Sequence, residues 1–144
     1  MDRKEFLAQL GLTSAAIFMG TCLGGCSKDD GGGGTTNVPP APTGVDFTIN
    51  LADAANSNLA TPGGYIYKSG IIVARTLADT YIAVSQACTH QGFTVVFEGT
   101  NNRFYCSNHG STFSTTGTVT TGPAGAPLTK YNTALTGTSL RVFS

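Results

Sequence analysis

From residue 45 onward, short runs of apolar residues alternate with polar ones. Residues 45–51 (VDFTINL) alternate as a half-buried strand does, because successive strand side chains point to opposite faces. Similar runs, rich in β-branched and aromatic residues, occupy 65–70, 71–77, 80–87, 94–98 and 103–106. No segment keeps the helical period, although residues 52–59 could form one short helix or an irregular loop. The pattern predicts an all-β, antiparallel domain over residues 45–144.

Two hairpins are predicted within this domain. Residues 94–98 and 103–106 flank a turn with the sequence GTNN, and residues 130–143 form a closing hairpin that turns near Thr136–Gly137. Residues 117–128 are mostly turn, since glycine, proline and threonine dominate them. We find no internal repeat.

The first 25 residues have the pattern of a signal peptide. Arg3 and Lys4 give a positive start, residues 7–19 are largely apolar, and small residues precede Cys26. The apolar run is short and interrupted, which disfavours a membrane-spanning helix. Residues 23–26 (LGGC) resemble a bacterial lipobox. The resemblance implies that Cys26 is lipidated and that the lipid anchors the protein to a membrane surface without a membrane-spanning segment.

We predict that residues 26–44 contain the lipidated cysteine followed by a flexible linker. Four glycines at 31–34 give flexibility, and three prolines then stiffen the chain. Residues 26–30 (CSKDD) resemble the acidic tag that directs some Gram-negative lipoproteins to the outer-membrane surface, although a solvated linker start explains them equally well. We therefore expect an exported lipoprotein of a Gram-negative bacterium, on the periplasmic face or the outer-membrane surface.

Composition narrows the function classes. Eight acidic residues balance eight basic ones, and no basic stripe occurs, so nucleic acid is excluded as a partner. The chain of 144 residues contains no Trp, so its core must be small. A bound metal centre would help to stabilise such a core.

Both histidines and two of the four cysteines lie in two short motifs, Cys88-x-His90 and Cys106-x-x-His109, with 15 residues between them. Structural zinc takes two Cys and two His, but zinc loops usually pair like ligands. A spacing of Cys-x-His is tight for one tetrahedral ion. It is natural in a Rieske [2Fe–2S] centre, where two Cys bind one iron and two His bind the other.

These motifs resemble the ligand loops of the Rieske family, and Gly92 matches a glycine that commonly follows the first histidine. Residues 122–124 and 127–128 look like the family's proline loop, and the resemblance extends from residue 66 to the C-terminus. It implies a small Rieske-type sandwich or barrel, with a rubredoxin-like cluster-binding subdomain of two loops at about 86–128 and one [2Fe–2S] cluster. The implied ligands are Cys88 and Cys106 on the inner iron, and His90 and His109 on the outer iron.

The resemblance also implies residues around the cluster. Gly92 and Gly110 would let backbone N–H groups approach the sulfurs, and a hydroxyl at Ser111 would hydrogen-bond one of them. Phe113 stands where high-potential members have a Tyr, and Phe93 and Asn108 stand where they have a disulfide. We therefore expect a reduction potential in the middle or lower part of the Rieske range. Gly122 and Pro123 would cover the cluster.

One-electron transfer between redox proteins outside the cytoplasm is the function we expect. The alternatives are the iron–sulfur subunit of a quinol-oxidising or molybdenum-type respiratory complex and, with less support, a structural zinc-binding lipoprotein. A ring-hydroxylating oxygenase would need two further His for a mononuclear iron, and the chain has two His in all. The protein is expected to be an electron carrier or an oxidoreductase subunit rather than a stand-alone catalyst.

Overall fold

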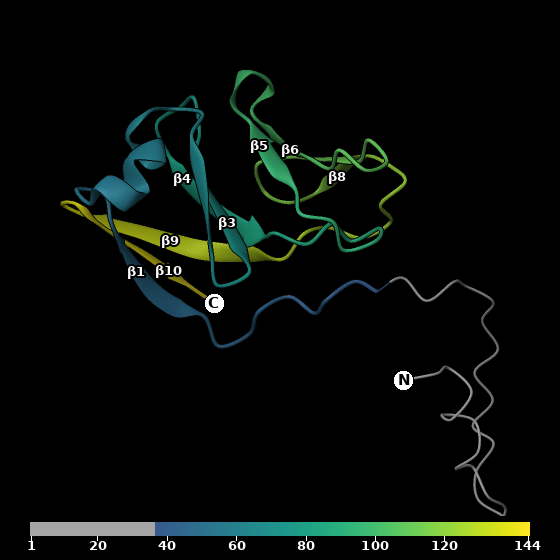
Figure 1. Ribbon diagram of the computed structural model, residues 1–144, viewed down its shortest axis with the longest axis horizontal. Coiled ribbons are helices and arrows are strands. Elements are labelled where there is room, and N and C mark those ends of the chain that lie inside the picture. The colour runs from purple at the N-terminus through teal and green to yellow at the C-terminus, as the bar shows by residue number, and fades with distance from the viewer. Residues whose placement is uncertain (1–36) are drawn as a thin grey trace, which may run out of the picture. The chain divides into compact units, whose positions relative to one another are not determined.

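Short antiparallel strands form the framework of the described part of the chain, residues 37–144 of a computed structural model (Figure 1). Ten strands in these residues form two sheets, with the orders β1-β10-β9-β4-β3-β2 and β5-β6-β7-β8. The predicted antiparallel all-β fold is confirmed. The signal peptide, Cys26 and the first part of the predicted linker lie outside the described residues. Within residues 37–144 we find no helix with the length and apolarity needed to cross a membrane.

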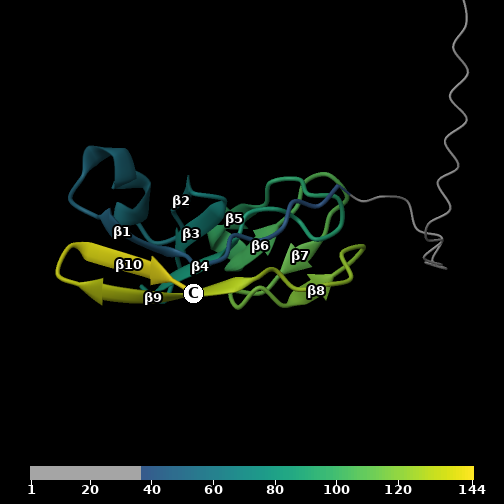
Figure 2. The same ribbon diagram turned by 90° about the horizontal axis from the view of Figure 1, so that it is seen from below.

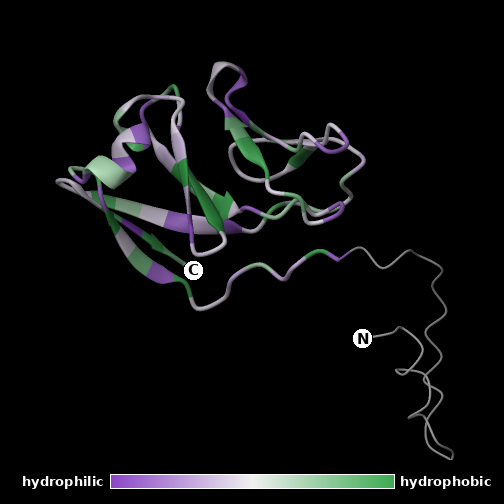
Figure 3. Cartoon of the chain, in the orientation of Figure 1, coloured by the Kyte–Doolittle hydropathy of each residue, from purple (hydrophilic) through white to green (hydrophobic). Residues whose placement is uncertain are grey.

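The larger sheet carries the predicted alternation most clearly at its closing hairpin. Leu140 and Val142 of β10 are buried, whereas Ser139 and Arg141 are exposed. Apolar residues are concentrated in the strands of both sheets (Figure 3). The strands of the larger sheet are β1 (Asp46–Asn50), β10 (Ser139–Phe143), β9 (Lys130–Thr136), β4 (Tyr81–Ser85), β3 (Ile71–Arg75) and β2 (Tyr65–Lys68).

Strand β3 separates two hydrophobic cores. Ile71 and Val73 pack into a core with β1, β9 and β10, while Ile72 and Ala74 pack into a second core. All four side chains are buried because alternate residues of a strand point to opposite faces and both faces of β3 are covered. The second core also contains both described cysteines, so the fold places the two motifs at one end of a packed interior.

The smaller sheet begins with the first predicted hairpin. Strands β5 (Val96–Glu98) and β6 (Arg103–Tyr105) are joined by the 3₁₀ turn η2 (Gly99–Asn101), and Arg103 pairs with Glu98 at 2.7 Å. Two short strands complete the sheet, β7 (Thr112–Phe113) and β8 (Val119–Thr121). The pattern did not predict β7, and β8 lies in a segment predicted to be mostly turn. Residues 54–60 form a 3₁₀ helix, η1 (Ala54–Ala60), so of the two alternatives for this segment, a short helix or an irregular loop, the structure has the helix.

The last part of the predicted linker lies against the domain. We call residues 37–42 (NVPPAP) the strap. In Figure 2 it leads from the loops at the end of the smaller sheet toward β1. The hydroxyl of Tyr131 on β9 donates a 2.7 Å hydrogen bond to the carbonyl of Pro42. The sequence predicted a tether with no fold of its own, and the described part of that tether is instead docked.

Candidate metal centre

Loop 1 (residues 88–93) joins the two sheets, because it follows β4 and leads to β5. The antiparallel pair Ala87–Thr94 closes its base. The N–H of Cys88 donates to the carbonyl of Phe93 at 2.7 Å, and the N–H of Gly92 donates to the carbonyl of Cys88 at 2.7 Å. Gly92 has φ +78°, a left-handed conformation that favours glycine.

Loop 2 (residues 106–111) repeats this conformation between β6 and β7, closed by the pair Tyr105–Thr112. The N–H of Cys106 donates to the carbonyl of Ser111 at 2.8 Å, and the N–H of Gly110 donates to the carbonyl of Cys106 at 3.0 Å. Gly110 has φ +79°. Each loop is therefore a turn that begins at a cysteine and is closed by a left-handed glycine.

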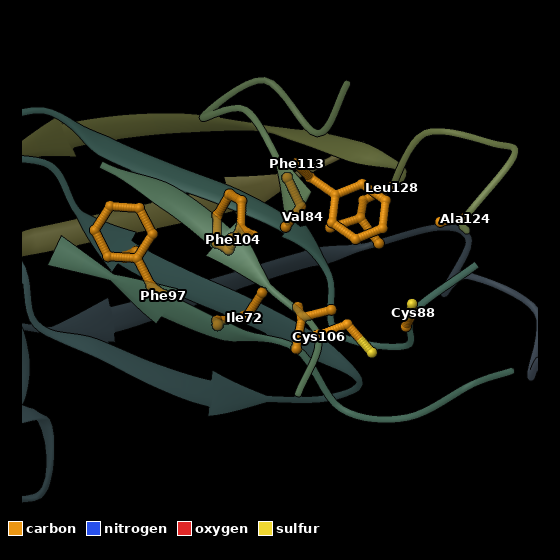
Figure 4. Close-up of a cluster of buried hydrophobic side chains, with 11 residues drawn as sticks. Ile72, Val84, Cys88, Phe97, Phe104, Cys106, Phe113, Ala124 and Leu128 are labelled. Carbon is orange, nitrogen blue, oxygen red and sulfur yellow. The ribbon is translucent and has the colours of Figure 1, made fainter. Parts of the chain in front are cut away.

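The two cysteines lie inside the protein. Their exposed fractions are 1% for Cys88 and 2% for Cys106, and both thiols lie at one end of the second core (Figure 4). Burial raises the pKa of the Cys88 thiol, and the neighbouring Cys106 raises it further, while backbone N–H groups of His90 and Gln91 lower it. The site thus offers two sulfur ligands that a metal must deprotonate on binding, with N–H groups already directed at one sulfur.

The two histidines lie at the surface side of the same loops. Their Nδ1 atoms are 3.2 Å apart, and the rings meet edge to face with centroids 4.7 Å apart. The side-chain amide of Asn108 also lies 2.9 Å from Nδ1 of His109. Two ring nitrogens that face each other at this distance could both bind one metal ion placed between them.

The four side chains form two pairs, one of buried thiols and one of imidazoles near the surface, and each loop supplies one member of each pair. His109 is exposed and His90 is half-buried. Within residues 37–144, no three His, Cys, Asp or Glu side chains gather as the ligands of one metal ion. The donor set fits a binuclear cluster with sulfur ligands on an inner iron and nitrogen ligands on an outer iron. Fold and site together define a small iron–sulfur domain.

Residues 122–128 return over the two loops. The backbone N–H of Ala124 donates to Oγ of the fully buried Ser111 at 3.0 Å, so the Ser111 O–H remains available as a donor. Ala124 and Leu128 are buried in the second core, whereas Gly122 and Pro123, the two residues predicted as cover, are exposed.

Phe113 is fully buried and contributes an apolar ring to the second core. Phe93 is 51% exposed, and Asn108 is also exposed. Cys88 and Cys106 are free thiols, so the described residues contain no disulfide between the loops.

Two polar contacts of the site were missed by sequence reasoning. Oγ1 of Thr89 donates to the carbonyl of Ala126 at 2.6 Å, and the amide of Asn108 donates to Oε1 of Gln91 at 3.4 Å. The first ties loop 1 to residues 122–128, and the second joins the two loops. Neither could be found in the sequence, because the partners are ordinary loop residues brought together by the fold.

The family model of the Rieske [2Fe-2S] domain matches residues 51–132, so the chain belongs to this family. The cytochrome b6-f complex iron-sulfur subunit of Chlorobaculum thiosulfatiphilum is 36% identical over 58 residues, 40% of this chain and 32% of the relative. The subunit of the same name from Trichodesmium erythraeum (strain IMS101) is 42% identical over 50 residues, 35% of this chain and 27% of the relative. The chain thus spans about a third of the length of these curated relatives.

Two solved structures cover most of the domain. The plasma membrane Rieske protein PetC3 from Synechocystis PCC 6803 matches with a TM-score of 0.53 and 28% identity, over 67% of this chain and 99% of that chain. The ferredoxin of carbazole 1,9a-dioxygenase from Nocardioides aromaticivorans IC177 matches with a TM-score of 0.54 and 25% identity, over 71% of this chain and 98% of that chain. The predicted Rieske fold is confirmed. The domain binds one [2Fe–2S] cluster.

Proposed function

We propose that this protein is a lipid-anchored, extracytoplasmic one-electron carrier whose [2Fe–2S] cluster is held by Cys88 and Cys106 on one iron and by His90 and His109 on the other. The observation that carries the ligand assignment is the equivalence of loops 1 and 2. Each presents one buried thiol and one imidazole, and the two Nδ1 atoms are 3.2 Å apart.

The thiolates and the imidazoles would have different roles in electron transfer. A [2Fe–2S] cluster held by these four side chains would supply one-electron redox chemistry. The buried thiolates would keep water from the inner iron, and the imidazoles near the surface would offer a partner protein the shortest route to the outer iron. Two neutral imidazoles in place of thiolates raise the reduction potential into a range of about −150 to +300 mV.

Within that range, we propose a potential in the middle or lower part. The O–H of Ser111 remains free to donate to a cluster sulfur. Phe113 is an apolar, fully buried ring and brings no second hydroxyl. Because hydrogen bonds to cluster sulfurs stabilise the reduced, more negative state, one donor in place of two lowers the potential.

The lipid anchor is proposed from the sequence. Residues 23–26 resemble a lipobox and precede a Gly- and Pro-rich segment. A lipid on Cys26 would hold the domain at a membrane surface beside its redox partners. Growth of cells with a labelled fatty acid tests this. The label should appear on the wild-type protein and be absent from Cys26→Ser, and a labelled Cys26→Ser protein would contradict the anchor.

A stable subunit of a respiratory complex is a second candidate, because the curated relatives are named as subunits of the cytochrome b6-f complex. The fold match to a ferredoxin over 98% of that chain favours a separate carrier instead. Purification from native membranes in mild detergent separates the two candidates. A protein that elutes without partners supports the carrier, and a stoichiometric cytochrome or other large subunit supports the complex.

Histidine ligation has a specific test because the chain contains two histidines. The full-length protein, purified without a histidine tag, is prepared with ¹⁵N-labelled histidine and reduced. Pulsed EPR should show two strongly coupled nitrogens whose frequencies follow the isotope. A signal that does not respond to the label would contradict the roles of His90 and His109.

A further inference from the structure

The strap lies against loop 1. Pro39, Pro40, Ala41 and Pro42 form one wall of a groove of about 250 Å³. The opposite wall is formed by the β2–β3 turn, the end of β4 and loop 1. The strap therefore touches the loop that carries Cys88 and His90.

Two glycines of the domain allow this close approach. A Cβ atom on Gly92 would lie 2.7 Å from the carbonyl oxygen of Asn37 and 2.8 Å from Cδ of Pro39. A Cβ atom on Gly70 would lie 2.9 Å from Cγ of Pro42. All three distances are shorter than carbon contacts in proteins permit, so any side chain at these positions would push the strap away.

Loop 2 has no such cover. Gly110 occupies the position in loop 2 that Gly92 occupies in loop 1, and its φ is +79° against +78°. A Cβ atom on Gly110 would meet nothing within 4 Å. The same backbone conformation is therefore covered by the strap in one loop and open in the other.

The strap is fixed to the domain at its C-terminal end. The buried Tyr131 donates its hydroxyl proton to the carbonyl of Pro42, at 2.7 Å. Proline restricts φ in the undocked chain as well as in the docked one, so less conformational entropy is lost when the strap settles. The proline-rich composition that suggests a linker is also suited to a docked segment.

We propose that the strap is a positioning element for loop 1: it clamps the loop that bears Cys88 and His90 and so restrains one half of the cluster site. It supplies a non-covalent restraint on loop 1 alone. This inference rests on the proposed ligand set only for its effect on the cluster. The docking of the strap is independent of it.

The first test needs no cluster. In the full-length protein as purified, residues 37–42 are replaced by a Gly-Ser sequence of the same length. Hydrogen exchange should become about tenfold faster in loop 1 and remain unchanged in loop 2. Tyr131→Phe should give a smaller change in the same direction, about fivefold, as expected for one lost hydrogen bond. Equal changes in both loops, or no change in either, would overturn the clamp.

The second test uses the glycine pair as a matched control. Gly92→Ala and Gly110→Ala are each made with the native strap and with the Gly-Ser strap, and the rate of cluster loss to a chelator is measured. Both substitutions carry the same backbone strain. Gly92→Ala should accelerate cluster loss more with the native strap than with the Gly-Ser strap. Gly110→Ala should accelerate cluster loss by the same factor with either strap. Equal factors for Gly92→Ala would contradict the proposal.

A spectroscopic measurement separates positioning from general stability. The EPR signal of the reduced Gly-Ser strap variant should be broader than that of the wild type, because loop 1 samples more conformations. Unchanged linewidths would overturn the positioning role. A wild-type protein that never binds a cluster would contradict the proposed function and leave the exchange experiment to decide the strap.

Discussion

Loops 1 and 2 have the same backbone conformation and different surroundings. In both loops, the N–H of the cysteine donates a hydrogen bond to the carbonyl of the residue five positions later. The N–H of a glycine in the left-handed conformation donates to the carbonyl of the same cysteine. Loop 2 connects neighbouring strands of one sheet, so the ladder between β6 and β7 holds its base. Loop 1 crosses from one sheet to the other and closes on a single isolated bridge.

The difference shows which features are encoded locally and which are not. The turn itself is set by a cysteine and by the glycine four residues later, within each short motif. The restraint of the turn comes from elsewhere. Loop 1 contacts the strap and Ala126 through Thr89, while Ser111 of loop 2 contacts Ala124. A loop with fewer ladder contacts has more contacts with distant segments.

The largest expected effect tests the equivalence of the two loops. Cys88→Ser and Cys106→Ser should each abolish cluster binding, because each removes one of the two buried thiolates. Iron and acid-labile sulfide should be absent from both purified variants. Ser107→Ala, an exposed change in loop 2, is the control and should retain the cluster. Normal iron content in either cysteine variant would contradict the ligand assignment.

The hydroxyls of Ser111 and Thr89 both hydrogen-bond to residues 122–128, and we expect their removal to have different effects. Ser111→Ala should lower the midpoint potential by about 60 mV, the value that corresponds to one lost hydrogen bond to the reduced cluster. Thr89→Val should instead speed cluster loss, because its hydroxyl donates to Ala126 and not toward the cluster. Redox titration and chelator kinetics measure the two effects. The reverse assignment, with Thr89→Val changing the potential more, would contradict this account.

A hydroxyl added at Phe113 should act in the opposite direction. Phe113→Tyr is expected to raise the midpoint potential by a few tens of millivolts, through a second hydrogen bond to the reduced cluster. Phe113 is fully buried, so thermal unfolding of the variant must be measured as a control for strain. An unchanged potential in a well-folded variant would mean that Phe113 contributes packing alone.

The smallest expected effect concerns the segment that follows loop 1. Burial raises the pKa of Tyr67 to about 12, and its hydroxyl donates to the carbonyl of Val95 at 2.8 Å. The unfolded chain ionises first, near the ordinary pKa of 10.0, so the free energy of unfolding should fall as pH rises from 10 to about 12.

Chemical denaturation of the metal-free protein across this pH range should show a shallower fall for Tyr67→Phe than for the wild type. The variant has no group at this position that ionises on unfolding. Identical slopes would contradict a role for Tyr67.

The strands and the ligand loops could be predicted from the sequence for different reasons. Buried Leu140 and Val142 between exposed neighbours give β10 the alternation that identifies a strand. The ligand loops have no such periodicity. The sequence indicates them because each of the two histidines lies two or three residues after a cysteine. Strand β7, with two residues, is too short for any pattern.

The remaining features depend on contacts between distant segments. The strap has a composition typical of a linker, and its docking depends on the absence of a side chain at Gly92 and on a hydroxyl at Tyr131. The bond from Thr89 spans 37 residues to Ala126. Nothing local distinguishes these residues from other glycine, tyrosine or threonine residues, so the sequence could not identify their partners.

Loops 1 and 2 together are proposed to hold one [2Fe–2S] cluster. An EPR-monitored redox titration of the detergent-solubilised, full-length protein, with iron and sulfide analysis of the same sample, tests it most directly. We predict two irons and two sulfides per chain and a Rieske-type signal on reduction, with a midpoint in the lower or middle part of the range of about −150 to +300 mV. An EPR-silent sample with stoichiometric zinc and no labile sulfide, even when prepared anaerobically, would contradict the claim.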